Sequence, residues 1–430
     1  MYAKAFSRET AAFWHRTSRQ LAARRGQLLW LLAILIFFGL GFGYYAHLRG
    51  RFHGLKTELK TIRDTPKAAA VATVGGQEPI VLERSPLGDS TMPEFLSAPL
   101  LPGRGMSVLQ LTASIPGRGV VSLLDGASLE QAVQLVPTTE ADPSGITTRR
   151  ISTPIELPWA GSVERSDDPG QTTSTLEWRG HPVDLPLTGP GTTSTGGLLL
   201  RLPSDGIEHN VMPDGGSVTA NFDARDFGAK WPSQTQVTVA ALLSNRAFDL
   251  RITARNTGRE PEPIGIGWSP RLVLPSGSRS TATLHLPADQ QEQELDHHAT
   301  GRLTDVTGTS LDFTSRTGKR LGSASIDATF VHLKTGFLDN GPVLELKDVD
   351  SGVGLRMSAL SQQIRAVRVQ TTEQLGGIRL GFQTNYDDPF SHAWSSDEAA
   401  GLYLLQPGQT IQWRVRLELF NITSDASSPL

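Results

Sequence analysis

The sequence predicts an all-β protein built around one large antiparallel β-sandwich. From Met106 onward, short runs of apolar residues alternate with polar residues, which is the period of a strand with one buried face. Turn-forming residues separate these runs roughly every 8 to 12 residues, a spacing typical of sandwich folds. We find no long amphipathic helix after residue 100. The polar outer faces of the strands favour antiparallel sheets.

Composition excludes several classes of function. The 430 residues include 40 basic and 43 acidic side chains, so the net charge of -3 implies no general affinity for nucleic acid. The chain has no cysteine, which excludes disulfides, thiolate metal sites and cysteine nucleophiles. We find no complete Walker, dinucleotide or Gly-x-Ser-x-Gly fingerprint. We therefore expect neither a cofactor nor a metal ion.

The N-terminal region predicts a membrane anchor. Residues 1–27 are polar and basic, and residues 28–46 read LLWLLAILIFFGLGFGYYA without a charge. As a helix, this stretch is roughly 28 Å long, enough to cross a bilayer core. A buried core helix or a cleaved signal peptide are the alternatives. A cleavable signal has a shorter apolar core and a small-residue cleavage site, whereas basic residues follow directly here.

The flanking charges predict the orientation of this anchor. Basic residues lie on both sides of the span, with a slightly larger excess before it. The positive-inside rule then favours a short cytoplasmic tail over residues 1–27 and an exported body. We expect a single-pass protein of the inner (plasma) membrane with its body on the periplasmic or extracytoplasmic side. Its partners would be the membrane, through residues 28–46, and a membrane protein complex.

Residues 47–105 predict a stalk, and residues 106–425 the β-sandwich. The first region is rich in Pro, Ala and Gly, a composition that buries too little apolar area to offset chain entropy. Docking of the stalk on the body remains an open alternative. Within the body, residues 236–243, 248–255 and 413–419 show the clearest alternation. They predict three half-buried strands.

The stretch from Thr300 to Leu346 is the most informative part of the body. It begins Thr300-Gly301-Arg302-Leu303-Thr304-Asp305-Val306-Thr307-Gly308-Thr309-Ser310-Leu311-Asp312-Phe313, and Gly336-Phe337-Leu338-Asp339-Asn340-Gly341-Pro342-Val343-Leu344 follows after a spacer. We expect Leu303, Val306, Leu311 and Phe313 to point inward from short extended segments. Asp339, just before an apolar run, would be a turn residue or a ligand contact.

This stretch resembles the aldose 1-epimerase (galactose mutarotase) family. The family has a Thr-Gly-x-x-x-x-Val-x-Gly-Thr-x-x-Asp-Phe segment, followed by a Gly-Tyr-Asp-His/Asn-x-x-Val-Leu segment whose Asp contacts the sugar. The resemblance places that Asp on Asp339 and extends weakly over residues 106–421. It implies a galactose mutarotase-like β-supersandwich and a sugar or glycan ligand.

At four other positions this chain departs from the family pattern. Ser162 stands where the family has a substrate-binding Arg, and no His occurs in Thr195-Gly196-Gly197-Leu198, where the family has a sugar-binding one. The resemblance places the general-acid His on Ser269 and the general-base Glu on Gly381. Epimerising a hemiacetal needs an acid and a base, each contributing roughly 10²–10⁴-fold. A saccharide site without the usual catalytic pair is therefore implied.

Other residues are candidates for the missing roles. Asp387, Asp388 and His392 form the best carboxylate–imidazole group for catalysis, with a solvated turn as the alternative. Asp339 and Gln383 are candidates for polar contact with a sugar. Trp159, Trp268 and Trp394 could stack on a pyranose face, with core packing as the alternative.

Three functions from different classes follow. The first is a membrane-anchored carbohydrate-binding or accessory protein. The second is an active aldose 1-epimerase with relocated catalytic residues. The third is a non-carbohydrate interaction module on the same fold, as in the periplasmic domain of the bacterial membrane-protein insertase, a family with more membrane spans.

Overall fold

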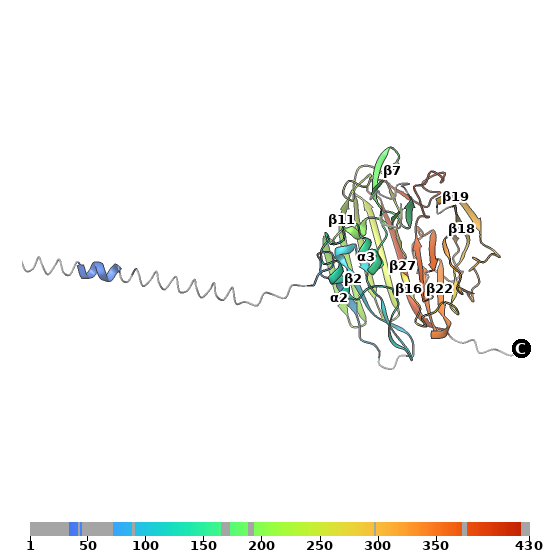
Figure 1. The fold of residues 1–430 in the computed structure, drawn as a ribbon, viewed down its shortest axis with the longest axis horizontal. Helices are drawn as coiled ribbons and strands as arrows, with labels where there is room; N and C mark the ends of the chain where they lie inside the picture. Colours follow the sequence, from blue (N-terminus) through green and yellow to red (C-terminus); the bar gives the residue numbers. More distant parts are fainter. Residues whose placement is uncertain are drawn as a thin grey trace, which may run out of the picture. The chain divides into compact units, whose positions relative to one another are not determined.

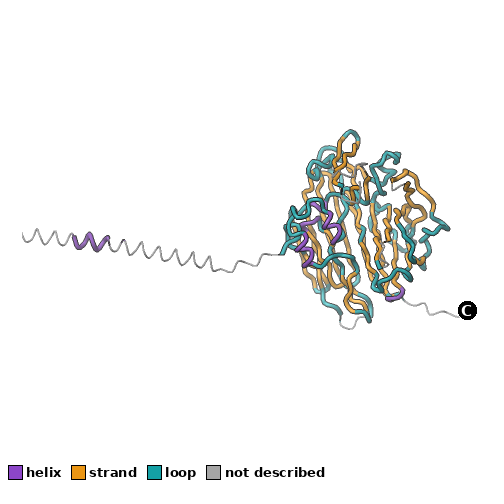
Figure 2. Tube along the Cα trace, viewed as in Figure 1, coloured by secondary structure: helices purple, strands orange, loops and turns teal. Residues whose placement is uncertain are grey.

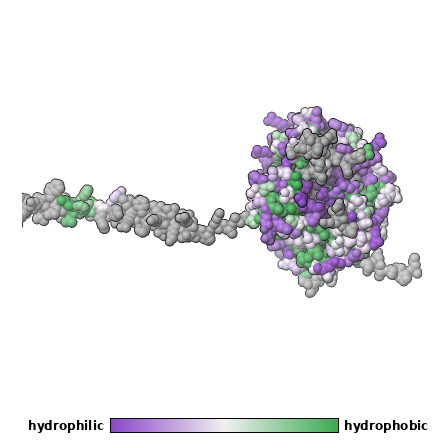
Figure 3. All heavy atoms as spheres, in the orientation of Figure 1, coloured by the Kyte–Doolittle hydropathy of each residue, from purple (hydrophilic) through white to green (hydrophobic). Residues whose placement is uncertain are grey.

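The structure, a computed structural model, describes residues 34–41, 44, 72–87, 91–164, 173–187, 193–295, 298–371 and 376–422. The chain divides into two compact units, Met1–Val71 and Ala72–Leu430. In the first unit, residues 34–41 and Tyr44 are helical and exposed, and Figure 3 shows their apolar character. None of the described helices is both long and apolar enough to cross a bilayer. Because most of the predicted tail, anchor and early stalk lies outside the described residues, those assignments stay predictions.

The second unit is built from antiparallel sheets, as Figures 1 and 2 show. The larger sheet has the order β10 (Gly206–Met212), β11 (Gly215–Arg225), β12 (Thr235–Leu243), β13 (Ala247–Asn256), β27 (Thr410–Asn421), β23 (Val353–Ala359), β22 (Val343–Asp348), β17 (Thr283–His285) and β20 (Lys319–Arg320). The second large sheet has the order β15 (Gly267–Trp268), β25 (Gly377–Gln383), β24 (Ala366–Thr371), β21 (Asp327–Leu333), β18 (Ala288–Leu295) and β19 (His298–Asp305), and β16 (Arg271–Val273) also pairs with β25.

Smaller elements complete this unit. A five-stranded sheet contains β1 (Ile80–Glu83), β2 (Glu94–Leu101), β3 (Ser107–Val108), β4 (Thr112–Ile115) and β5 (Gly119–Ser122). Three two-stranded sheets pair β6 (Ser162–Glu164) with β9 (Thr193–Thr195), β7 (Thr173–Trp178) with β8 (His181–Pro186), and β14 (Glu262–Ile264) with β26 (Tyr403–Leu405). The short helices are α2 (Leu129–Leu135), α3 (Ile146–Ile151), and the 3-10 turns η1 (Pro102–Arg104), η2 (Leu199–Arg201) and η3 (Val349–Ser351).

One hydrophobic core joins the two large sheets. It contains Val239 and Leu250 from the larger sheet and Phe330, Val367 and Leu380 from the second, all with no exposed surface. The three strands predicted from alternation are confirmed as β12, β13 and β27. Their inward residues are buried because successive side chains of a strand point to opposite faces.

Two sequence expectations need correction. The predicted stalk does not extend past residue 71, because β1 and β2 belong to the compact unit and Phe95 and Leu100 have no exposed surface. The apolar residues between the prolines bury enough area to hold this segment on the body. In the Thr300 stretch, Val306 and Phe313 point inward as expected, but Leu303 is 40% exposed because it lies on β19, the last strand of its sheet.

Candidate functional site

The candidate site begins with a groove of about 450 Å³ where β21 and β23 end and β24 begins. Its lining is mainly polar and consists of His332, Leu333, Thr335, Asn340, Gly341, Pro342, Ala359, Leu360, Ser361, Gln362, Ile364, Arg365 and Tyr386. The segment singled out in the sequence thus contributes its residues 340–342. Asp339 itself is exposed in a turn, where its backbone N–H donates to the Gly336 carbonyl at 3.1 Å.

The loop that carries Asp339 also presents two apolar side chains to solvent. Phe337 is 97% exposed and Leu338 90% exposed. Thr335 and Asn340, on either side of them in the chain, line the groove. The Phe337 ring buries almost none of its area in the fold, so its face is accessible to a ligand.

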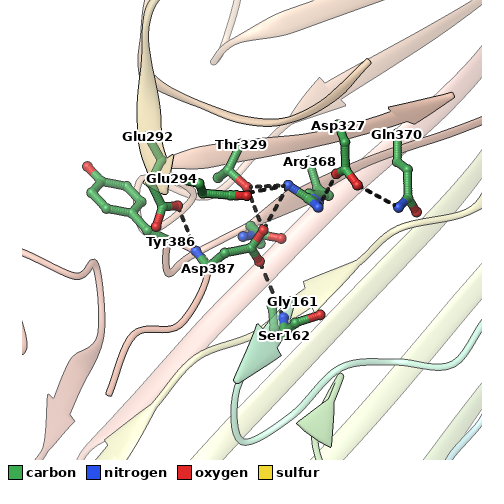
Figure 4. Close-up of polar contacts among 12 residues, drawn as sticks. Gly161, Ser162, Glu292, Glu294, Asp327, Thr329, Arg368, Gln370, Tyr386 and Asp387 are labelled. Atoms are coloured by element: carbon green, nitrogen blue, oxygen red, sulfur yellow. Dashed lines mark hydrogen bonds and ion pairs between the residues drawn. The ribbon is translucent and has the colours of Figure 1, made fainter. Parts of the chain in front are cut away.

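Tyr386 lines the groove, and the next residue, Asp387, belongs to a buried polar cluster. Figure 4 shows the Tyr386 ring beside Glu292 of that cluster. Its ring packs against Trp394 with 5.4 Å between ring centroids. Burial raises the pKa of the Tyr386 hydroxyl and outweighs the opposing effect of the Arg365 charge. The phenol is therefore a neutral donor at any physiological pH.

Asp387 lies at the centre of the cluster. Its Oδ2 accepts a hydrogen bond from Thr329 Oγ1 at 2.8 Å and lies 2.9 Å from Arg368 Nη1. Its Oδ1 accepts from the Ser162 backbone N–H at 3.4 Å, and its own N–H donates to Glu292 Oε2 at 3.0 Å. Asp387 therefore connects the strands β18, β21, β24 and β6 (Figure 4).

Strand register explains why these side chains meet. Thr329 on β21 lies directly opposite Arg368 on β24. Residues two apart share a face, so Val367 and Val369 enter the core while Arg368 points away from it. Glu292 and Glu294 belong to the neighbouring strand β18. The second sheet thus presents a row of charged side chains on the face opposite the core.

Burial controls the charge of this cluster. Glu292 is only 4% exposed, and its burial, followed by the charges of Asp387 and Glu294, raises its pKa to about 9. At neutral pH it is a neutral acid. Burial opposes the charge of Arg368, but Asp387, Asp327 and Glu294 outweigh it and raise the pKa of this guanidinium. In the buried Asp387–Arg368 pair the two charges compensate each other, and Glu292 beside it adds no further charge at neutral pH. Removing either partner would leave an uncompensated buried charge.

The same three carboxyl groups have the composition of a cation site. One oxygen from each of Glu292, Glu294 and Asp387 lies within 4.8 Å of the others. However, Arg368 Nη1 lies 2.9 Å from Asp387 and 3.6 Å from Glu294, so a positive charge is already supplied. We assign the cluster no metal.

The two positions assigned to the catalytic pair are direct neighbours. A Cβ placed on Gly381 would lie 2.7 Å from Ser269 Oγ and 2.2 Å from the Trp268 carbonyl oxygen. Ser269 is 7% exposed, and its Oγ has no hydrogen-bond partner among the described residues. A glutamate at 381 would therefore collide with the backbone of the adjacent strand.

Most of the sequence-predicted aromatic contacts are part of the core. Trp159 has no exposed surface and stacks on Trp231 with 5.8 Å between centroids. Trp268 is equally buried against Phe248. Neither ring offers a face to a saccharide, so both predictions are corrected. The apolar area of an indole is better buried than exposed.

The other predicted residues are dispersed. Gln383 is fully buried and donates to the Asn385 carbonyl at 2.8 Å, a structural role. Trp394 is 9% exposed and donates from Nε1 to the Asp388 carbonyl at 3.1 Å, which fixes the loop. Asp388 has a positive φ of 42° in this loop, and His392 is exposed. The expected Asp387–Asp388–His392 group is not brought together by any described contact, and only Asp387 enters the cluster.

Sequence reasoning missed Glu292, Arg368 and Tyr386. A partial signal was present for the first, since residues 290–294 are uniformly polar, which predicts a polar sheet face without indicating which of these side chains is buried. Glu292 is buried because a distant loop covers that face and brings Asp387 beside it. The two residues are 95 positions apart in the sequence. Such a contact leaves no local pattern.

Comparison with known proteins identifies the family to which the chain belongs. Residues 172–418, more than half of the chain, match the family model described as aldose 1-epimerase. The chain therefore belongs to the aldose 1-epimerase family, and the sequence resemblance is confirmed. Among curated proteins, none matches this chain in sequence.

Solved structures show the fold, which is galactose mutarotase-like. A galactose mutarotase-like protein from Clostridium acetobutylicum has a TM-score of 0.61 at 14% identity, covering 79% of this chain and 98% of its own. An aldose epimerase homologue from C. elegans has a TM-score of 0.59 at 15% identity, covering 80% and 99%. A galactose 1-epimerase from Lactobacillus acidophilus NCFM has a TM-score of 0.52 at 14% identity, covering 80% and 99%.

Proposed function

We propose that this protein is a membrane-anchored carbohydrate-binding or accessory protein whose aldose 1-epimerase domain lacks the usual acid–base pair. The observation that carries the proposal is the close approach of positions 381 and 269. Serine cannot act as a general acid near neutral pH, glycine has no side chain, and the backbone at 2.2 Å leaves no space for a replacement at 381.

Saccharide binding is supported by the groove. Its volume of about 450 Å³ is in the range of small-ligand sites, and Asn340, Gln362 and Arg365 supply hydrogen-bonding groups. Phe337 in the adjoining loop is available for stacking on the apolar face of a sugar ring. Membrane anchoring rests on residues 28–46, and export of the body on the basic residues before them.

Calorimetry and polarimetry with the full-length chain in detergent test this function together. We expect galactose or glucose to bind without faster anomer exchange than in buffer. Phe337→Ala should weaken binding about tenfold, since an aromatic contact contributes roughly 1 kcal/mol beyond its buried area. Val211→Ala, at an apolar residue that is 81% exposed on β10, is the matched control and should bind like the wild type. Rapid anomer exchange by the wild type would refute the loss of catalysis, and failure to bind any sugar would favour an interaction module.

One observation favours a second candidate, an active epimerase with relocated groups. Glu292, protonated at neutral pH, lies beside the Asp387 carboxylate, so a proton donor and an acceptor are adjacent. If this pair were catalytic, anomer exchange would be fast in the wild type and lost in Glu292→Gln. The same rate in both proteins would exclude it.

A further inference from the structure

A second cluster, formed by arginines, lies outside the groove. Arg271 on β16 and Arg379 on β25 are directly opposite each other in the antiparallel pair. Like charges in this arrangement destabilise a sheet. Arg379 also shares its face of β25 with Gly381, two residues further along, and therefore lies beside the position of the missing catalytic base.

Arg271 is fully engaged by the protein. It donates from Nη1 to the Arg149 carbonyl and from Nη2 to the Arg150 carbonyl, both at 2.7 Å, and it also reaches Asp125. These contacts satisfy the C-terminal end of helix α3, where cations are favourable. The role of Arg271 is therefore structural.

Arg379 and Arg149 are not engaged in this way. The guanidinium of Arg379 makes no hydrogen bond or ion pair within the described residues, and its Nε is buried. The Nε of Arg149 is also buried without an acceptor, and its Nη2 reaches only the Gly196 carbonyl at 3.5 Å. Both side chains are nevertheless partly exposed, so solvent or a ligand can reach them. A buried guanidinium donor without an acceptor is costly unless a bound group satisfies it.

Compensating negative charge in this region is weak. Glu156 is a buried carboxyl group whose charge acts on both arginines, but it forms no described ion pair with either of them. Burial raises the pKa of the Glu156 carboxyl group, against the effect of the two arginines. Asp142 acts on Arg149 from a distance but already accepts the backbone N–H groups of Thr147 and Thr148. Arg201 adds another positive charge nearby. The net charge around Arg149 and Arg379 is therefore positive.

The position of Arg149 connects this cluster with the family's ligand site. A Cβ on Gly196 would lie 2.3 Å from Arg149 Nη1 and 3.1 Å from Glu156 Cγ. Gly196 belongs to the segment 195–198, which the resemblance aligns with the family's sugar-binding His. Arg149 therefore fills space that a side chain at 196 would need.

We propose that Arg149 and Arg379 form a subsite for the oxoanion of an acidic saccharide, a carboxylate, sulfate or phosphate. This inference rests on the proposed carbohydrate-binding function. Guanidinium groups bind such anions through paired, charge-assisted hydrogen bonds, which the N–H groups of Arg379 and those of Arg149 that do not reach the Gly196 carbonyl can donate. Their part exposure and net positive surroundings select an anion over a neutral hydroxyl.

The test compares sugars that differ in one group. Binding of galactose, galacturonate, galactose 6-sulfate, galactose 6-phosphate and sodium sulfate to the full-length chain in detergent is measured by calorimetry at low ionic strength. We expect at least one acidic sugar to bind about tenfold or more tightly than galactose, and this preference to weaken with salt. The sugar with the largest preference identifies the anionic group.

Substitutions assign the effect to these residues. Arg149→Gln and Arg379→Gln should each bring the affinity for the acidic sugar to within about twofold of that for galactose. Arg150→Gln, at the exposed neighbouring position on α3, should leave the preference intact. Thermal unfolding of each variant checks folding, and Arg379→Gln removes no hydrogen bond of the protein and should fold normally.

The outcomes separate the two proposals. Galactose binding without any preference for an acidic sugar, or a preference that survives in the double variant, would overturn the anion subsite and leave the proposed function standing. Binding of sulfate that depends on Arg149 and Arg379, with no saccharide bound, would support the subsite and overturn the carbohydrate function. Binding of none of these probes would overturn both.

Discussion

At the scale of single residues, the most informative group is Glu292, because its protonation is linked to folding. Burial and the nearby carboxylates raise its pKa from an ordinary value near 4.5 to about 9. Between these two pH values the folded protein holds a proton that the unfolded chain lacks. The stability that this bound proton contributes is fully present below pH 4.5 and is lost as the pH rises towards 9.

We therefore expect stability to fall between pH 7.5 and 8.5 by roughly 1 kcal/mol on account of this residue. This window lies above the pKa of about 7 to which burial raises Glu262, which reduces interference from that group. Glu292→Gln keeps an acceptor for the Asp387 N–H and needs no proton, so its stability should vary less with pH. Urea unfolding at both pH values measures the difference.

Glu208→Gln is the control for this prediction, because Glu208 is an exposed glutamate on β10. It should retain the slope of the wild type. An unchanged slope in Glu292→Gln would mean that Glu292 is ionised in the folded protein, and the charge assignment of the cluster would be wrong.

Residue-level reasoning from sequence located the two positions that the resemblance assigns to the catalytic pair, but it did not find Glu292, Arg368 and Tyr386. Ser269 and Gly381 were identified by their place in a family pattern, and the structure brings them into contact. For Trp159 and Trp268 the sequence left both sugar stacking and core packing open, because an indole reads the same whether it packs inward or outward. Only the surrounding side chains, such as Trp231 and Phe248, decide this.

At the scale of elements, alternation identified the long strands of the larger sheet and failed for segments rich in proline. β12, β13 and β27 have one face in the core and one in solvent, so their period is visible. β2 is buried on nearly every residue, and its sequence EFLSAPLL has no alternation to detect. The composition of residues 47–105 therefore suggested a stalk, although its second half folds onto the body.

This correction predicts that β2 is essential for the stability of the body. Phe95 has no exposed surface and packs in the main core with Leu82 and Leu100. Phe95→Ala should lower the free energy of unfolding by about 3–5 kcal/mol, the cost of removing a buried phenyl ring. Leu87→Ala, at a residue that is 52% exposed, should change it by less than about 0.5 kcal/mol. If both variants were equally stable in urea unfolding, β2 would contribute little to the stability of the body, and the prediction would be wrong.

At the scale of the whole molecule, the fold was predictable and the site was not. Family pattern and strand period both depend on residues close in sequence or on a few fixed identities, and they gave the galactose mutarotase-like sandwich correctly. The site instead depends on which loop covers the polar face of the second sheet. Residues 384–402 do so by placing Asp387 between Thr329, Arg368 and Glu292.

The membrane anchor is the prediction that belongs to the whole chain. Residues 28–46 carry no charge and as a helix would span roughly 28 Å, so the full-length protein should remain in the membrane fraction after alkaline extraction. Deleting residues 28–46 should release it, whereas deleting residues 3–20 from the polar tail should not. The intact mass distinguishes an anchor from a cleaved signal peptide, since only the anchor retains residues 1–46.

The orientation of the anchor is tested separately. If the body is exported, protease added outside intact spheroplasts should degrade the protein down to a fragment containing the anchor. Full protection would reverse the orientation and place the saccharide groove in the cytoplasm.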